Sequence, residues 1–565
     1  MRRVRLLALF GDMVRYSGAA TSVIVVEDLH WIDDASAEFL DVLVRAVVGT
    51  RTLLLFNYRP RFIAPWAALP HFRQIDLAEL GAADTEALVQ ALVGPGRSRA
   101  EWHDVLALVV ARSAGNPFFA EELVRSLLEG GTLSNRSDAP LPSLVVLAQA
   151  LPATVQAVIG ARIDRLGTTQ KAVLHICAVI GKEIPLPVLQ QVALYLASQI
   201  EYELTGLCNA ELLQLVCEIA GGRRFAFRHP LMQEVAYSTQ FKARRANLHA
   251  AVAVAMEGHY RTQPDEFAAL IAYHYASAGQ FLNAAQHEAR AAKWAGSTNT
   301  GQAIKHWRKV WTLLEGQARS QQVNSLRALA GGRIVYLGWR EGLSQEEVQQ
   351  VIQEAIGHAN EVDSRLVQLL LFAQGRILQS GGGAADDYVD CVLKALSLTP
   401  PGGDMGRVAM LKVALSQAYA WAGLLEQGLA ANDGALLGMA SIDKFDREFI
   451  DFSIEQWALG IRVRLLIRMN RLDDAQACLQ QMLSADEMLN DPVIRQITHH
   501  LHVEFAAITR NATLVQEHAA IVVNLAQQYA SPYSKVFALW CSGFSETSAG
   551  NLAAAQRSFS EALEF

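Results

Sequence analysis

The sequence has little charge and little cysteine. Only 19% of its 565 residues are charged, and the formal net charge is −7. No basic domain or basic stripe is present, so the composition argues against a nucleic-acid-binding protein. The six cysteines are scattered without a CxxC pair, which argues against a disulfide framework and a zinc site and is typical of a reducing compartment.

Long hydrophobic runs are also missing. The chain is 51% hydrophobic, yet no uninterrupted apolar run approaches about 18 residues, so we expect no membrane span. The basic residues at the start are followed by an apolar core at Leu6–Phe10, which is too short for a signal peptide. These absences predict a cytoplasmic protein. The length and the high hydrophobic content predict several domains with large cores.

A short β-branched run near the start leads into two consecutive acids. Residues Val23–Val26 predict a strand buried on both faces, and Glu27 and Asp28 follow it directly. Carboxylates in this place can hold Mg²⁺ and orient a water for attack on a phosphate, which is the Walker B pattern of an NTPase. The alternative is a strand that ends in solvated acids.

The surrounding segments predict alternating strands and helices, and therefore a parallel sheet. Arg59 follows the second strand, at the edge where open α/β sheets bind ligands. It can sense a γ-phosphate, or it can cap a backbone carbonyl. The predicted helices are Val4–Tyr16, Ala35–Val48, Asp84–Leu92 and Trp102–Arg112, and the further strands are Thr52–Asn57 and Phe72–Leu77.

The phosphate loop that normally precedes such a strand is absent from the sequence. No Gly-x-x-x-x-Gly-Lys-Ser/Thr occurs, and the turn at Gly94–Ser98 lacks the lysine. Only 22 residues precede Val23, which is enough for one helix. We therefore expect the start to be truncated relative to a longer ancestor, or the NTPase to be degenerate.

Two later motifs add candidate ligand contacts. Gly115, Asn116 and Pro117 form a helix-breaking turn before paired phenylalanines, and Pro117 can lie against a purine or simply form a helix–helix corner. His229 stands between a strand and a helix. It can donate to a diphosphate, or it can be a satisfied core histidine.

Taken in order, these motifs resemble the STAND-type AAA ATPase module found behind class III adenylate/guanylate cyclase domains and in large LuxR-type regulators. The motifs are Glu27-Asp-Leu-His-Trp, Tyr58-Arg-Pro, Gly115-Asn-Pro-Phe-Phe-x-Glu-Glu-Leu and Phe227-Arg-His-Pro-Leu-x-x-Glu-x-x-Tyr. The resemblance covers roughly residues 1–260 and implies ATP or ADP with Mg²⁺ as cofactors. The missing phosphate loop is its main departure from the family pattern.

The resemblance also implies roles for individual residues. Glu27 and Asp28 would serve Mg²⁺ and water, with Asp28 catalytic, and Arg59 would be the sensor arginine. Gly115, Asn116 and Pro117 would line the adenine. His229 would help to hold the ADP-bound state.

The middle of the chain predicts a winged-helix-like unit. Helices at Pro152–Ile163, Lys171–Ile180 and Val188–Ser198 precede a strand at Phe225 and a helix from Pro230. A basic recognition helix is lacking, so nucleic acid is not the expected partner.

The second half predicts degenerate tetratricopeptide (TPR) repeats. A turn pattern returns at Gly279, Gly423, Asn470 and Gly550: a left-handed cap, an apolar residue two positions on, and a small residue three further. Such an array would present a surface to a protein or peptide partner, or would cover the NTPase module. The chain stops inside a repeat, so we expect the C-terminus to be truncated too. His499, His500 and His502 have no carboxylate spaced for a metal triad, and zinc is not predicted.

The predicted fold class is a partial P-loop NTPase α/β sheet, then a helical and winged-helix region, then an all-α TPR-like superhelix. The predicted domains are 1–95 for the α/β core, 96–140 for a helical lid, 141–260 for the winged-helix-like domain and 261–565 for the superhelix. The predicted function is an ATP/ADP-dependent STAND switch, from a fragment or degenerate copy of a cyclase-associated ATPase. The alternatives are a non-catalytic TPR scaffold and a fragment of a LuxR-type transcription activator.

Overall fold

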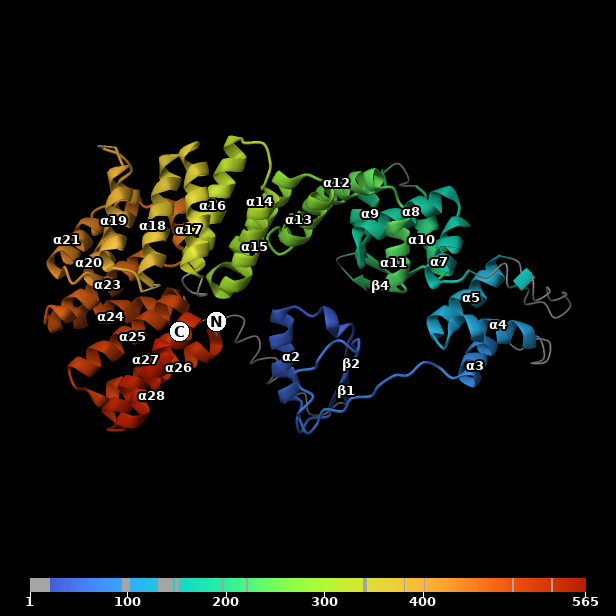
Figure 1. Cartoon of the computed structure of the whole chain (residues 1–565), viewed down its shortest axis with the longest axis horizontal. Coiled ribbons are helices and arrows are strands. Elements are labelled where there is room, and N and C mark those ends of the chain that lie inside the picture. Colours follow the sequence, from blue (N-terminus) through green and yellow to red (C-terminus); the bar gives the residue numbers. More distant parts are fainter. Residues whose placement is uncertain are drawn as a thin grey trace. The chain divides into compact units, whose positions relative to one another are not determined.

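In the computed structural model the chain forms two compact units. Unit 1 holds Met1–Ile75 and Ala292–Phe565, and unit 2 holds Asp76–Ala291 (Figure 1). The described residues are 21–93, 102–130, 146–147, 152–194, 198–219, 222–338, 343–380, 382–400, 402–489, 492–529 and 532–564. The predicted helix Val4–Tyr16 and the turn Gly94–Ser98 lie outside them.

The first part of unit 1 is a β–α–β element. Strands β1 (Ser22–Val26) and β2 (Thr52–Phe56) pair in parallel, and α2 (Asp34–Ala46) connects them after the short 3-10 turn η1 (Leu29–Trp31). Leu40, Leu43 and Val44 of α2 are buried against the sheet. The predicted parallel pairing and its crossover helix are confirmed.

The prediction that the first strand is buried on both faces is wrong. Every second side chain of both strands is about half exposed: Val23 57%, Val25 54%, Leu53 57% and Leu55 53%. Successive strand side chains point to opposite faces of a sheet, and α2 packs against only one of them. A continuous apolar run therefore did not imply two covered faces.

The prediction of a third strand at Phe72–Leu77 is also wrong. This segment has no regular structure, and Ile75 and Leu77 are 72% and 93% exposed. A parallel strand needs a crossover connection, usually a helix, to return to the sheet. Here the chain after β2 makes turns instead. They bury Ala64 and Trp66, whose indole Nε1 donates to Asp41 at 3.1 Å.

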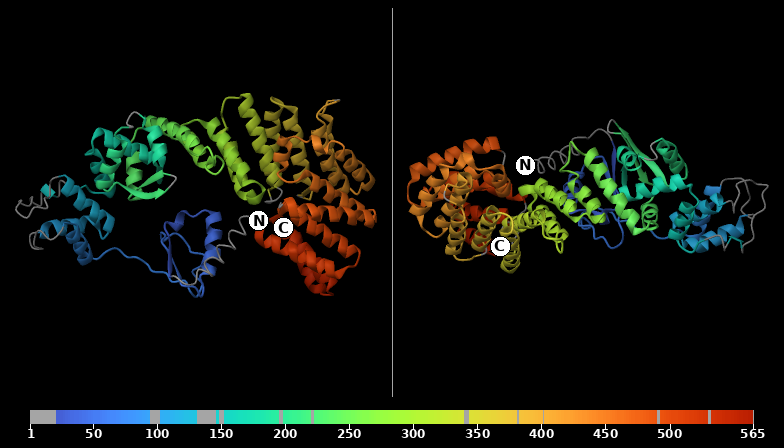
Figure 2. Two further views of the ribbon diagram at one scale, coloured as in Figure 1. Left: turned by 180° about the vertical axis from the view of Figure 1, so that it is seen from behind. Right: turned by 90° about the horizontal axis from the view of Figure 1, so that it is seen from above.

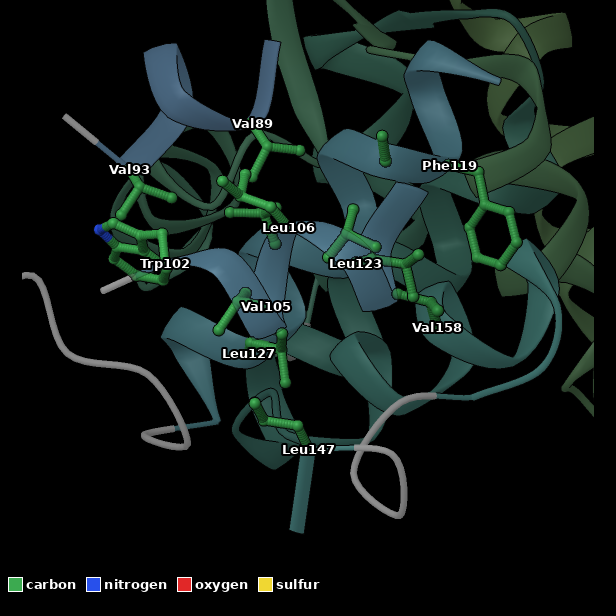
Figure 3. Packing of buried hydrophobic residues seen from close by; sticks show 13 residues of the cluster. Val89, Val93, Trp102, Val105, Leu106, Phe119, Leu123, Leu127, Leu147 and Val158 are labelled. Carbon is green, nitrogen blue, oxygen red and sulfur yellow. The ribbon is translucent and has the colours of Figure 1, made fainter. Parts of the chain in front are cut away.

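Unit 2 begins with three helices around one core. They are α3 (Ala82–Val93), α4 (His103–Ser113) and α5 (Pro117–Glu129). Val89, Leu106 and Leu123 meet at the centre of the cluster, and Val158 of the next helix closes it (Figure 3). Helix α3 thus packs with the predicted lid helices, whereas the sequence-based boundary at residue 95 separated it from them.

The rest of unit 2 contains the predicted winged-helix-like arrangement. An antiparallel sheet with strand order β3-β5-β4 packs with helices before and after it. Its strands are β3 (Glu183–Pro185), β4 (Leu213–Ile219) and β5 (Gly222–Phe227). Its helices are α7 (Val155–Asp164), α8 (Thr168–Ile180), α9 (Leu186–Val192), α10 (Ile200–Asn209), α11 (Pro230–Ser238) and α12 (Lys242–His259). Helix α10 and strand β4 were not predicted from the sequence.

Helices continue to the end of the described chain, and most neighbours in sequence from α15 onward pack against each other (Figures 1 and 2). They are α13 (Ala268–Ser277), α14 (Phe281–Ala295), η3 (Gly296–Asn299), α15 (Thr300–Leu313), α16 (Gln321–Gly338), α17 (Gln345–Asn360), α18 (Ser364–Ser380), α19 (Ala385–Ser397), α20 (Met405–Trp421), α21 (Leu425–Leu436), η4 (Met439–Ser441), α22 (Lys444–Ile450), α23 (Ile454–Arg468), α24 (Leu472–Leu489), α25 (Pro492–Ile508), α26 (Ala512–Tyr529), α27 (Pro532–Ser548) and α28 (Leu552–Leu563). Within the described ranges, none of these or the earlier helices has the length and apolarity needed to cross a bilayer. The predicted all-α TPR-like array is confirmed.

The turns between paired helices have the predicted left-handed geometry. The φ angles are +76° at Gly279, +75° at Gly423, +57° at Asn470 and +81° at Gly550. Five residues after each cap comes the small residue that allows close packing, such as Ala284, which is fully buried. Glycine and asparagine tolerate this backbone region better than other residues.

One turn of the same kind escaped the sequence pattern. Arg510, between α25 and α26, has a φ of +56°. It lies 40 residues after Asn470 and 40 before Gly550, so the apparent 80-residue gap between those turns contains a regular repeat. The pattern failed there because arginine occupies a position that usually carries glycine or asparagine.

Replacing this arginine is expected to stabilise the array. Arg510→Gly removes the clash of a Cβ in the left-handed region and should raise the free energy of unfolding by about 1 kcal/mol. Gly550→Ala is the matched reverse change, since an added Cβ there meets no atom within 4 Å. It should lower the stability by a similar amount. Urea unfolding followed by tryptophan fluorescence measures both, and a loss of stability in Arg510→Gly would contradict the expectation.

A long-range contact ties the middle of the array together. The guanidinium of Arg333 on α16 donates to the carbonyls of Glu448 and Phe449, and the hydroxyl of Tyr336 donates to the Ile450 carbonyl at 3.2 Å. These carbonyls belong to the end of α22, where a helix leaves its last acceptors without internal partners. Side chains of α16 therefore cap a helix more than 100 residues further along the chain.

Candidate functional site

The two predicted acids lie where β1 ends. Glu27 is exposed and Asp28 is half-buried, with a left-handed φ of +57°. The Asp28 amide donates to the side-chain oxygen of Asn57 at 2.6 Å, and the Leu29 amide donates to the Asn57 carbonyl at 3.0 Å. Asn57 directly follows β2, so the carboxyl ends of both strands are joined here. Sequence reasoning missed this role, although an asparagine that ends an apolar strand was visible.

Arg59 is exposed and lies three residues beyond β2, at the same edge of the sheet. Its carbonyl accepts from the Phe62 amide at 2.9 Å, which begins a turn. Among the described residues, no ion pair joins Glu27, Asp28 or Arg59 to another side chain. The acids and the arginine are therefore not consumed by a structural salt bridge within that part of the chain.

The chemistry of the two acids is compatible with Mg²⁺. Magnesium usually takes one or two protein carboxylates together with phosphate oxygens and waters. Glu27 and Asp28 offer that number. No cluster of three or more potential metal ligands occurs in the part of the chain that the structure describes. A metal here would therefore need a phosphate or waters to complete its shell.

The Gly-Asn-Pro turn is the start of helix α5. The side-chain oxygen of Asn116 accepts from the Phe119 amide at 3.0 Å, and Pro117 occupies the first helical position. Gly115 has a φ of +77°, and a Cβ on it would lie 2.6 Å from the Leu80 carbonyl oxygen. The turn thus requires glycine for packing and asparagine for capping.

His229 has the same position at the start of α11. Its Nδ1 accepts from the Leu231 amide at 3.1 Å, and Pro230 follows at the first helical position. Because Nδ1 is the acceptor, the neutral ring carries its proton on Nε2. The geometry therefore makes His229 a hydrogen-bond donor through Nε2.

The two helix starts meet. The rings of Phe118 and His229 stack at 3.8 Å between centroids, with 14° between their planes. Phe118 is the second residue of α5, and His229 is the cap of α11. The positive ends of two helix dipoles therefore lie together, and such ends attract anions.

Four charged side chains form a network that includes Arg228, the neighbour of His229 in the chain. Arg125 pairs with Glu121 at 2.8 Å and with Glu211 at 2.5 Å, and Arg228 contacts the same two glutamates. Burial acts to lower the pKa of Arg125, but hydrogen bonds to Glu121 and Glu211 outweigh it and raise that pKa. Sequence reasoning missed this network, because its members come from three separate elements.

A buried ion pair fixes α5 against the winged-helix part. Arg162 on α7 has a side chain only 1% exposed. Its Nη1 donates to both oxygens of Glu122, at 2.9 and 2.7 Å, and its Nε and Nη2 donate to Glu129. Both glutamates are on α5. This joint sets the orientation of α5, and with it that of Phe118 at the other end of the helix.

The predicted site residues thus form two groupings. Glu27, Asp28 and Arg59 share the edge of the sheet in unit 1, and the Gly115–Pro117 turn shares a helix junction with His229 in unit 2. Binding of nucleotide or Mg²⁺ by either grouping stays a prediction.

Similar proteins are found among curated sequences and among solved structures. No protein-family model matches the sequence. The uncharacterised protein R02095 of Rhizobium meliloti (strain 1021) is 27% identical over 232 residues, or 40% of this chain and 22% of that protein. The chain thus spans about a fifth of this curated relative. A solved STAND protein with a tetratricopeptide repeat sensor, PH0952 from Pyrococcus horikoshii, aligns with 99% of this chain and 82% of its own, at 11% identity and a TM-score of 0.38.

Proposed function

We propose that this chain is a signal-transduction module of the STAND type, in which ADP or ATP binding sets the display of a TPR-like partner-binding array. The observation that carries the proposal is the meeting of the α5 and α11 N-termini at the Phe118–His229 stack. Two converging helix N-termini and an Nε2–H donor favour a phosphate group. Binding rather than hydrolysis is proposed, because the sequence has no phosphate loop.

The remaining predicted residues have roles in the same proposal. At the sheet edge of unit 1, Glu27 and Asp28 would hold a phosphate-bound Mg²⁺, and Arg59 would contact a phosphate there. Pro117 offers a flat apolar surface to a base. A cyclase domain upstream and a cytoplasmic location belong to the same proposal.

Nucleotide binding is tested by calorimetry and thermal shift with ADP and Mg²⁺ on the full chain. We expect the wild type to bind and to melt at a higher temperature with ligand. His229→Asn keeps a cap on α11, since asparagine is a strong N-cap, but removes the ring and its Nε2–H. The variant should fold normally and bind at least tenfold more weakly, a loss of about 1.4 kcal/mol.

His103→Asn is the matched control. His103 is exposed in the first turn of α4, so the same substitution there should leave ADP affinity unchanged. Asp28→Asn and Arg59→Ala should each abolish the thermal shift produced by ATP and Mg²⁺. Equal ADP affinity in wild type and His229→Asn would refute the assignment of the α5–α11 junction.

A second candidate function is a non-catalytic scaffold. The regular 40-residue spacing of Asn470, Arg510 and Gly550 favours it, since stacked repeats of this kind form extended binding surfaces for proteins or peptides. An absence of nucleotide binding in the calorimetric experiment would favour this scaffold. A fragment of a LuxR-type activator would share the array.

A further inference from the structure

The TPR-like array contains a cavity that the proposed nucleotide switch does not use. Its volume is about 490 Å³, and it lies where the end of α15 meets α16 and α17. Two arginines, two glutamates and a histidine line it: Arg319, Arg327, Glu354, Glu361 and His358. The formal charges of the arginines and glutamates cancel, so the cavity offers groups of both signs without a net charge.

One wall is a buried arginine with an unused donor. The side chain of Arg327 is 7% exposed, packs over the ring of Trp311 at 4.6 Å and donates to the Leu314 carbonyl at 3.3 Å. Its Nη2 pairs with Glu354, and its Nε is buried without a hydrogen-bond partner among the described residues. Glu354 is 43% exposed, so its carboxylate can still accept from a ligand.

Next to Glu354 is a second acceptor, the Nε2 atom of His358. The Asn324 amide donates to Glu361 at 2.7 Å, so its oxygen faces His358 Nδ1 at 2.8 Å and accepts from it. Nδ1 therefore carries the proton, and Nε2 has a lone pair. Burial, aided by the charge of Arg327, lowers the pKa of His358 and favours this neutral form.

The spacing of these acceptors suits an ammonium group. His358 Nε2 lies 3.9 Å from the nearer Glu354 oxygen. An ammonium nitrogen between them would be within hydrogen-bond distance of both, and it has three donors to share.

The donors for an anion come from Arg319. Its side chain is 69% exposed and pairs with Glu361. A guanidinium has five N–H donors in a planar fork, and one carboxylate partner uses at most two of them. Arg319 can therefore bind a second carboxylate.

We propose that this cavity binds a free α-amino acid with an apolar side chain. The ammonium group lies between Glu354 and His358, the carboxylate binds Arg319, and the side chain lies along the wall that includes Val323. A zwitterion keeps the charge balance of the cavity, whereas a ligand of one sign leaves a charge without a partner. The inference goes beyond the nucleotide switch and does not depend on it.

Calorimetric titration of the full chain with L-leucine, L-valine and L-methionine tests the proposal. We expect saturable binding of at least one of them. The N-acetyl derivative of an amino acid lacks the ammonium group, and its amide derivative lacks the carboxylate. For each amino acid that binds, such as L-leucine, both derivatives (here N-acetyl-L-leucine and L-leucinamide) should bind at least tenfold more weakly. No heat from any of the three amino acids, or equal affinity of either derivative, would overturn the proposal.

A cavity-filling variant locates the binding. Gly357 on α17 lines the cavity, and an added Cβ there meets no atom within 4 Å. Gly357→Leu should therefore fold normally and lower the affinity at least tenfold without touching the ion pairs. Gly160→Leu on α7, also a helical glycine with open space, is the control and should bind as the wild type does. Arg319→Gln should weaken binding tenfold. Unchanged affinity in Gly357→Leu would contradict the assignment to this cavity.

Discussion

Acidification from about pH 7 to pH 5 is expected to destabilise both units strongly, because each contains histidines buried in the neutral form. Burial lowers the pKa of His249 to about 4 and that of His274 to about 3 in unit 2. It lowers the pKa of His499 to about 3 and that of His518 to about 4 in unit 1. An unfolded chain binds a proton on each near pH 6.5, so stability is lost as the pH falls below that value.

The hydrogen bonds between the rings explain why protonation is opposed. The Nδ1 atoms of His249 and His274 are 2.9 Å apart, and Tyr237 contacts Nε2 of His249 at 2.9 Å. Only one proton can lie between two facing nitrogens, so a second would place two N–H groups against each other. At pH 5 each such histidine should cost about 2 kcal/mol, against a typical domain stability of about 5–15 kcal/mol.

Urea unfolding at pH 7, 6 and 5 measures the effect. The slope of the unfolding free energy against pH reports how many protons the chain takes up on unfolding. In His274→Gln this number should fall by about one, because glutamine keeps a polar partner for His249 but does not titrate. His103→Gln, at an exposed position, is the control and should leave the slope unchanged. A free energy of unfolding that does not change between pH 7 and pH 5 would show that the histidines are not held neutral.

Removing the guanidinium of Arg162 is expected to lower the stability of unit 2 by about 3–5 kcal/mol. Arg162→Ala leaves the carboxylate of Glu122, which is 2% exposed, without its partner. Burial already raises the pKa of Glu122 against the attraction of Arg162, so an uncompensated charge there is costly. The α5 helix should then loosen from α7, and ADP affinity at the Phe118–His229 junction should fall with it.

An exposed pair on α2 provides the control. Arg45 and Asp41 are 3.1 Å apart with side chains 62% and 45% exposed, so Arg45→Ala should leave the free energy of unfolding nearly unchanged. The double variant Arg162→Met with Glu122→Gln removes both buried charges and should recover most of the stability. Urea denaturation monitors all three, and a change below 1 kcal/mol in Arg162→Ala would contradict the expected role.

Local patterns predicted elements well where one segment determines its own structure. The β-branched run before Glu27 gave β1, and the apolar run from Thr52 gave its parallel neighbour. Burial and pairing depend on what else packs nearby. For this reason the exposed face at Val23 and the missing strand at Phe72 could not be read from the runs themselves.

The candidate site shows the same division. Gly115, Asn116 and His229 could be selected from the sequence, but their capping roles and the stacking of His229 on Phe118 depend on two helices that are far apart in the chain. The same holds for His499, whose Nδ1 lies 2.8 Å from Nδ1 of His518 on the next helix. Spacing within one helix could not reveal that partner.

The capping of α22 by Arg333 and Tyr336 bears on how the array unfolds. Stacked repeats that contact only their neighbours can fray from either end, one helix pair at a time. The bonds from α16 to the carbonyls of Phe449 and Ile450 close a loop of more than 100 residues, so the intervening helices have to melt cooperatively. The helices from α23 onward lie outside this loop and are the ones that can open early.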